Sequence, residues 1–178
     1  MTEDSPGKHT DRLSELAAAR RLRVCVAESL TSGQLASAVG AGADASDWFA
    51  GGIVAYLTDA KERVLGLAPG TDPCSAACAE QLAAGARRLF DADICVSTTG
   101  VGGPGSENGH PAGTVFLGWA TPDAVGHRRL SLPGDPPSVL DATVAAATRL
   151  LAFRIETLHP AGPRRTGQTP AEDISARG

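Results

Sequence analysis

Segments with helical periodicity alternate with short apolar, strand-like runs along most of this chain. A helix is indicated over 10–21 and a strand over 23–27, and a second small helix follows the break at Thr31, Ser32 and Gly33. The run 51–57 has the pattern of another strand. Because strands separated by helices pair mostly in parallel and are covered by helices on both faces, this alternation predicts an α/β fold.

The second half of the chain continues the alternation and then changes it. The pattern predicts a short helix over 59–65, a longer one over 75–90 and a strand over 92–99. Two strand-like runs, 113–121 and 127–132, flank a turn and predict a hairpin, and a last amphipathic helix is expected over 136–153. We therefore expect a three-layer α/β/α sandwich with a mostly parallel sheet and a late antiparallel hairpin.

The length and composition are those of a single domain. A chain of 178 residues with 42% hydrophobic residues can form one sizeable core. Residues 1–9 are polar and expected to be flexible, and 158–178 are rich in proline, glycine and charge, which predicts a disordered tail. The domain is expected to span 10–157.

The charge pattern narrows the possible partners. The net charge is −4 and no basic block occurs, so nucleic acid is not an expected partner. No apolar run of about eighteen residues exists to span a membrane, and no apolar signal core follows Met1, so we expect a cytoplasmic protein. The expected partner is a small molecule or another protein.

The four cysteines are expected to be reduced, because a chain of this size does not need disulfides to fold. They are Cys25, Cys74, Cys78 and Cys95. Cys74 and Cys78 could share a helix face, but no histidine or further cysteine supplies the remaining ligands of a zinc site at regular spacing. We expect neither a metal nor another cofactor.

Polar and small residues follow the strand-like runs, where α/β sheets bind their ligands. After the first strand come Glu28, Ser29 and the turn Thr31, Ser32 and Gly33. This turn could bind a phosphate at the start of a helix, or it could be an ordinary helix cap. The residue pattern alone leaves both interpretations open.

A glycine-rich loop follows the third strand and contains the spacing G-x-G-x-x-G at Gly100, Gly102 and Gly105. A dinucleotide site would need a helix beginning at this loop, but its prolines and the strand-like run that follows argue against one. We therefore reject an oxidoreductase of the Rossmann type. Close approach of Gly100, Gly102 and Gly103 to a ligand and a plain connection both remain open.

Ser29, Ser46, Tyr56 and Lys61 could form a nucleophile and base set that uses no histidine. A serine hydroxyl needs a proton acceptor, and a lysine held away from water can serve as one. The alternatives are a solvated surface lysine and, for Ser46, a helix cap. Composition and spacing do not choose between them.

Six blocks of sequence, taken in order, resemble the CinA C-terminal domain family. They are AESLTSG (27–33), ADASDWF (43–49), GGIVAYLTDAKERVLGL (51–67), STTGVGGPG (97–105), PAGTVFLGWA (111–120) and LPGD (132–135). The resemblance implies a metal-independent amidohydrolase that converts nicotinamide mononucleotide to nicotinate mononucleotide and ammonia, a step of pyridine nucleotide salvage. It also implies a homodimer as the assembly expected by analogy.

The resemblance also implies roles for individual residues. Ser46 matches the family's nucleophile, Lys61 its general base, and Ser29 and Tyr56 the hydroxyls of the proton network, although Ser29 and Ser46 could exchange roles. Residues expected to contact the substrate are Glu28, Thr31, Ser32, Gly33, Thr99, Gly100, Gly102 and Gly103.

This chain departs from the family where a substrate phosphate would be held. The family places arginines after Pro-Gly-Asp, whereas Pro136 and Pro137 follow Asp135 here. Arg87, Arg128 or Arg149 could replace them. The rival hypothesis is therefore a catalytically weak or inactive nucleotide-binding or interaction module of the same fold.

Overall fold

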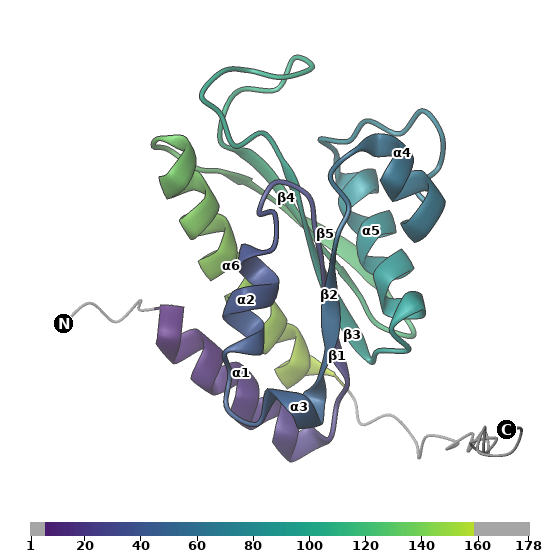
Figure 1. Ribbon diagram of the computed structural model, residues 1–178, viewed down its shortest axis with the longest axis vertical. Helices are drawn as coiled ribbons and strands as arrows, with labels where there is room; N and C mark the ends of the chain where they lie inside the picture. Colours follow the sequence, from purple (N-terminus) through teal and green to yellow (C-terminus); the bar gives the residue numbers. More distant parts are fainter. Residues whose placement is uncertain (1–5, 159–178) are drawn as a thin grey trace, which may run out of the picture.

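The computed structural model describes residues 6–158, which form a five-stranded sheet between two layers of helices (Figure 1). The strand order is β2-β1-β3-β4-β5. The strands are β1 (Val24–Glu28), β2 (Phe49–Val54), β3 (Ile94–Gly100), β4 (Thr114–Ala120) and β5 (Val125–Ser131).

The sheet is mixed, and only β4 runs against the other strands. β1 pairs in parallel with both β2 and β3, while β4 pairs antiparallel with β3 and β5. The expected α/β fold with a late antiparallel hairpin is thus confirmed. The carboxyl ends of β1, β2 and β3 meet at one edge of the sheet, since Glu28 is opposite both Val54 and Thr98.

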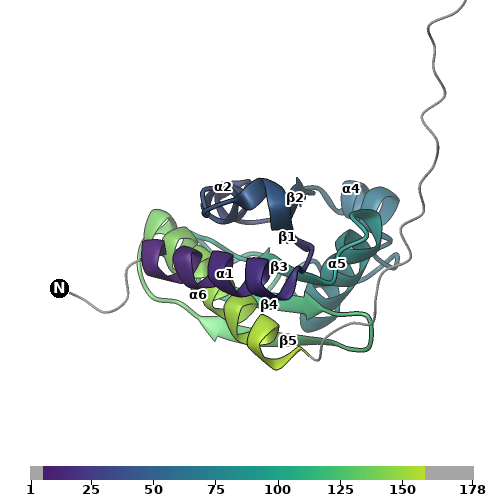
Figure 2. The ribbon, with the colours of Figure 1, turned by 90° about the horizontal axis from the view of Figure 1, so that it is seen from below.

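The helices form the two outer layers, as Figure 2 shows. One layer contains α1 (Pro6–Arg20), α2 (Gln34–Gly40) and α6 (Pro136–Thr157), and the opposite face is covered by α5 (Ala76–Leu89). The short α3 (Ala45–Trp48) precedes β2, and α4 (Thr58–Ala60) continues into a π-helical turn, η1 (Lys61–Leu65).

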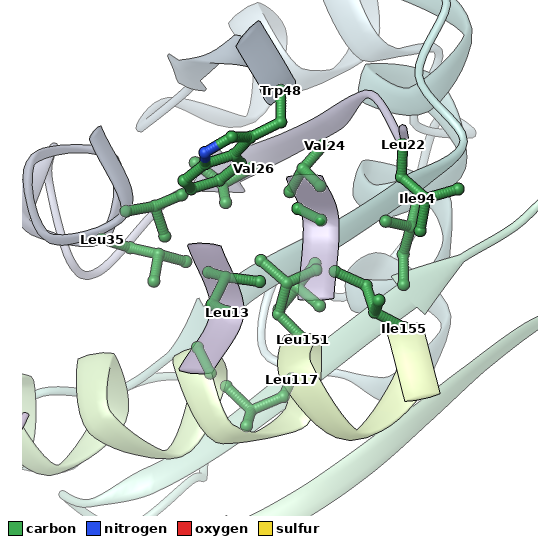
Figure 3. Packing of buried hydrophobic residues seen from close by; sticks show 14 of the residues in the cluster. Leu13, Leu22, Val24, Val26, Leu35, Trp48, Ile94, Leu117, Leu151 and Ile155 are labelled. Carbon is green, nitrogen blue, oxygen red and sulfur yellow. The ribbon is translucent and has the colours of Figure 1, made fainter. Parts of the chain in front are cut away.

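The larger core lies between the sheet and the layer of α1, α2 and α6. Figure 3 shows Leu13 of α1 and Leu151 and Ile155 of α6 packed beneath Val24 and Ile94 of the sheet. All five side chains are fully buried. Truncating one such leucine to alanine typically costs about 2–5 kcal/mol, so this core is a main source of the fold's stability.

Several boundaries differ from the sequence-based expectations. α1 begins at Pro6, inside the segment expected to be flexible, and α6 continues to Thr157. α3 was not expected, and β2 ends at Val54, so Tyr56 lies beyond the strand. Of the expected tail, 159–178 lie outside the described residues. No helix between residues 6 and 158 is both long and apolar enough to cross a membrane.

All four cysteines are buried and free of disulfides. Cys25 and Cys95 are neighbours in register on β1 and β3, where burial beside the other thiol raises the pKa of Cys95. In the described part of the chain, no three histidine, cysteine, aspartate or glutamate side chains gather as a metal site would require.

Candidate functional site

A cavity of about 190 Å³ opens at the carboxyl ends of β1, β2 and β3. Three segments that follow these strands form its walls, and the residues before α5 close it. The lining residues are Ser29, Leu30, Tyr56, Leu57, Thr58, Lys61, Pro73, Cys74, Thr99, Gly100, Val101, Glu107 and Asn108. Ligands of α/β proteins bind at this edge of the sheet, so the cavity is the candidate site.

Lys61 is buried in this wall, with only 3% of its surface exposed. It begins the π-helical turn η1, and its N–H donates to the Leu57 carbonyl at 3.1 Å. Single π-helical turns are rare and often occur at functional sites. Within residues 6–158 Lys61 Nζ makes no hydrogen bond or ion pair, and it is not a fully buried atom, so it is open to the cavity that the residue lines.

Two thiols lie at or near the cavity. Burial raises the pKa of Cys78, and the positive charge of Lys61 opposes that increase. Cys74 lines the cavity itself, and burial, reinforced by the charges of Asp72 and Glu107, raises its pKa to about 11. Both cysteines are therefore protonated near neutral pH and are not nucleophiles there.

Three of the expected hydroxyl residues reach the cavity. Ser29 is 7% exposed and follows β1, where its N–H donates to the Thr98 carbonyl at 3.0 Å. The Thr99 hydroxyl donates to the Pro73 carbonyl at 2.5 Å, which ties the end of β3 to the segment before α5. Tyr56 is 62% exposed and forms the open side of the cavity.

The glycine loop, residues 101–113, arches over the cavity without forming a helix. Glu107 and His110 bond through both backbone N–H groups around Asn108 and Gly109, which adopt positive φ angles as a tight turn requires. This arrangement confirms the rejection of a dinucleotide fingerprint. Gly100 lines the cavity, whereas Gly102 and Gly103 are not among the lining residues.

The loop is tied to the opposite wall through His110 and Asp72. His110 Nε2 lies 2.7 Å from Asp72 Oδ2. Although partial burial of the carboxyl opposes it, hydrogen bonds from the Cys74 N–H and from His110 lower the pKa of Asp72. The pair therefore holds the loop against the segment that precedes α5.

Glu28 does not face the cavity, which corrects the expectation that it contacts substrate. Its fully buried carboxylate accepts the N–H groups of Gly33, Leu35 and Ala36 at 2.8–3.0 Å. It also accepts the Thr31 hydroxyl at 2.6 Å. The Glu28 carboxylate therefore caps α2, since the free N–H groups at a helix start need acceptors when they are buried, and the Thr31 hydroxyl supports that carboxylate.

The same contacts argue against a phosphate site at Thr31, Ser32 and Gly33. The Glu28 carboxylate already occupies the position that an anion would take at the start of α2. Ser32 and Gly33 have positive φ angles and are not among the residues that line the cavity. Of the two interpretations of this turn, the structure supports the helix cap.

Ser46 lies at the amino-terminal end of β2, whereas Lys61 lies beyond the carboxyl end of the same strand. It belongs to α3, which precedes β2, whereas Tyr56 and Lys61 follow the same strand (Figure 1). A strand rises about 3.3 Å per residue, so β2 separates the two ends by roughly 16 Å. Ser46 is exposed, and its hydroxyl contacts Asp47 Oδ1 at 3.4 Å. The chain therefore does not bring Ser46 and Lys61 together as a nucleophile and base.

The three arginines that were considered as replacements for the family's phosphate-binding arginines lie outside the candidate cavity. Arg128 and Arg149 line a separate groove between β5 and α6, and Arg87 donates to the Ala92 carbonyl at 3.2 Å. Among the described residues, no arginine lines the candidate cavity, where Lys61 is the single cation and Glu107 the single acid.

Sequence reasoning did not single out Leu30, Cys74, Glu107 and Asn108 as residues of this cavity. The Asn108-Gly109 pair is a strong signal for a tight turn, and it could have located the tip of the loop. Its position over the cavity depends on the contact between Asp72 and His110, which local sequence does not encode.

The comparison with family models matches residues 7–155 to the CinA C-terminal domain. A putative competence-damage inducible protein of Desulforamulus reducens is 35% identical over 133 residues, which cover 72% of this chain and 32% of that protein. Protein YdeJ of Escherichia coli is 39% identical over 115 residues, covering 62% of this chain and 67% of YdeJ. The chain spans about a third of the length of the first curated relatives that it matches.

Solved structures give the same result. A CinA superfamily protein from Klebsiella pneumoniae superposes with a TM-score of 0.82 at 31% identity and covers 86% of this chain and 99% of its own. The competence damage-inducible protein A of the same species gives 0.83 at 30% identity, with 87% and 99% covered. This chain belongs to the CinA C-terminal domain family.

Proposed function

We propose that this chain is a metal-independent amidohydrolase that converts nicotinamide mononucleotide to nicotinate mononucleotide and ammonia. The observation that carries the proposal is that Lys61, a largely buried residue whose Nζ has no hydrogen bond or ion pair within residues 6–158, lines one cavity together with Ser29. A lysine that is largely enclosed by the protein and open only to a cavity is placed to act on what binds there. The resemblance to the family supports the choice of substrate.

In the mechanism that we propose, Ser29 Oγ attacks the carboxamide carbon and Lys61 Nζ accepts the hydroxyl proton. The tetrahedral intermediate collapses as the carbon–nitrogen bond breaks, and the proton passes from Lys61 to the departing nitrogen, which leaves as ammonia. Water then attacks the Ser29 ester, releases nicotinate mononucleotide and returns the proton to Ser29.

The negative oxygen of the tetrahedral intermediate needs a hydrogen-bond donor. Among the described residues, the Leu30 N–H, which directly follows Ser29 at the cavity, donates no hydrogen bond. We assign this N–H to the oxyanion. One such donor is typically worth about 3 kcal/mol of barrier.

The test is ammonia release from nicotinamide mononucleotide in the presence of EDTA. Wild-type protein should turn over, and Ser29→Ala should lower kcat by about a thousandfold or more, because it removes the nucleophile. Ser37→Ala is the matched control, since Ser37 is an exposed serine on α2 and its loss should leave kcat unchanged.

The contrary outcomes separate the alternatives. Turnover that EDTA abolishes, or that Ser29→Ala retains, would contradict the mechanism. A wild-type protein that binds the nucleotide in calorimetry without releasing ammonia would contradict the enzyme and support the binding module.

A further inference from the structure

Two walls of the candidate cavity carry charges of opposite sign. Lys61 lies in the segment that follows β2, and Glu107 lies on the loop that joins β3 to β4. Figure 1 shows this loop extending beyond the carboxyl end of β3. Among the described residues that line the cavity, no other side chain is charged near neutral pH. A ligand in the cavity therefore meets a basic group on one wall and an acidic group on another.

The backbone of Glu107 is fixed, whereas its carboxylate has no partner. The Glu107 N–H donates to the His110 carbonyl at 3.0 Å, and its carbonyl accepts the His110 N–H at 2.8 Å. His110 in turn lies 2.7 Å from Asp72, on the segment before α5. Within residues 6–158 the Glu107 carboxylate makes no hydrogen bond or ion pair. The loop therefore presents an exposed carboxylate at the cavity, where a ligand can pair with it.

The charge of Glu107 acts inside the cavity. Cys74 lines the cavity wall, and its pKa is raised to about 11, first by burial and then by the negative charges of Asp72 and Glu107. The positive charge of Arg129 lowers that pKa, but its effect is smaller than that of either carboxylate. The potential beside Cys74 is therefore negative, which favours a cationic group in this part of the cavity.

The volume of the cavity limits which part of a substrate it can enclose. The cavity measures about 190 Å³, which is below the roughly 300–1,000 Å³ of pockets that enclose a whole drug-sized ligand. A single aromatic ring is small enough for such a space, whereas a ribose phosphate attached to that ring extends beyond it. Recognition therefore falls on the ring. In nicotinamide mononucleotide the ring nitrogen carries a fixed positive charge, because it is bonded to the ribose.

We propose that Glu107 selects amides carried on a cationic ring, by placing its carboxylate beside the charged ring nitrogen. This inference rests on the proposed function, which assigns the carboxamide of the same ring to Ser29 and Lys61. The substrate class is then the pyridinium carboxamides, and the ring charge defines it more than the ribose or the phosphate does. A neutral pyridine carboxamide gains nothing from Glu107.

Binding tests the selection without turnover. The two probes are 1-methylnicotinamide, which has the charged ring without ribose or phosphate, and nicotinamide, whose ring is neutral. In NMR titrations, Glu107→Gln should weaken 1-methylnicotinamide by about fivefold, which is the upper end for an exposed ion pair, and should leave nicotinamide within about twofold of wild type. Asp123→Asn is the matched control, because it removes an equal charge from the exposed turn between β4 and β5 and should change neither affinity.

Three results of the titrations would overturn the proposal. One is an equal weakening of both probes by Glu107→Gln, which would mean that the variant alters the shape of the loop rather than a charge. The second is an unchanged affinity for 1-methylnicotinamide in this variant. The third is a wild-type chain that binds neither probe.

Turnover adds a second measurement. For nicotinamide mononucleotide, Glu107→Gln should raise KM by about fivefold and leave kcat unchanged, because the pairing holds ground state and transition state equally. For the reduced mononucleotide, whose dihydropyridine ring is neutral, the same variant should change neither constant. An equal loss for both substrates would overturn the selection by charge. If wild-type chains release no ammonia, the proposed function fails, while the titrations still decide the role of Glu107.

Discussion

The Thr31 hydroxyl donates to Glu28 Oε2 across 2.6 Å, and both residues are fully buried. Thr31 also lies 2.7 Å from the Thr98 hydroxyl on β3. Because Ser29 stands between Glu28 and Thr31, these hydrogen bonds hold the turn that carries the proposed nucleophile. The fold and the candidate site therefore depend on the same buried carboxylate.

Glu28→Gln should lower the free energy of unfolding by about 1–3 kcal/mol, because an amide has one accepting oxygen for the N–H groups and hydroxyl that the carboxylate now accepts. Urea unfolding measures the loss. Glu80→Gln is the control, since Glu80 contacts His127 at the surface, where an ion pair is worth at most about 1 kcal/mol. Equal losses for the two variants would contradict the capping role.

The contact between Asp72 and His110 predicts a pH dependence of stability. Because the pKa of Asp72 is lowered below its ordinary value of 3.8 in the folded state, its contribution is present above that value and is lost as the pH falls through the folded-state pKa. Thermal unfolding should therefore show wild type more stable than Asp72→Asn at pH 6, and the difference should shrink below pH 3.8. A difference that grows in acid would contradict the prediction.

Cys74 should react slowly although it lines the cavity. With a pKa of about 11, roughly one thiol in a thousand is ionised at pH 8, and only the thiolate reacts with iodoacetamide. Mass spectrometry should show slow alkylation that accelerates as the pH is raised and that becomes fast in urea. Rapid native alkylation at pH 8 would mean that burial does not hold the pKa this high.

The cavity also predicts a weak preference for the substrate phosphate. Since no arginine lines it in the part of the chain that the structure describes, the phosphate lacks a bidentate partner. Removing the phosphate from nicotinamide mononucleotide, to give the riboside, should lower kcat/KM by less than about tenfold, which is 1.4 kcal/mol. A hundredfold loss would show that a phosphate-binding group reaches the site from elsewhere.

The sequence predicts the sheet and its main helices well, because their apolar residues repeat with the period of each element. The prediction from sequence fails for elements that are too short to show a periodic pattern or that depend on a single contact. The turn at Lys61 becomes π-helical, and α3 is a single turn too short to show periodicity. In sequence, Glu28 looks like a ligand-binding residue. A carboxylate at the end of a strand is equally compatible with a ligand-binding site and with a buried cap of the following helix.

Part of the candidate site could be predicted from the sequence, because the order of the strands determines which residues meet. Ser29 follows β1, Tyr56 and Lys61 follow β2, and Thr99 lies near the end of β3. Because these strands are parallel, the topology gathers the four residues at their carboxyl ends. Ser46 precedes β2, so the fold of one chain places it at the amino-terminal end of that strand, away from the cavity.

Ammonia release by Lys61→Arg tests the central claim most directly. Arginine keeps the positive charge but does not give up its proton, so it cannot act as the general base. We predict that kcat for nicotinamide mononucleotide falls by about a hundredfold or more, while circular dichroism and the unfolding midpoint stay close to wild type. A variant that keeps most of the wild-type turnover would contradict the assignment of Lys61 as the base.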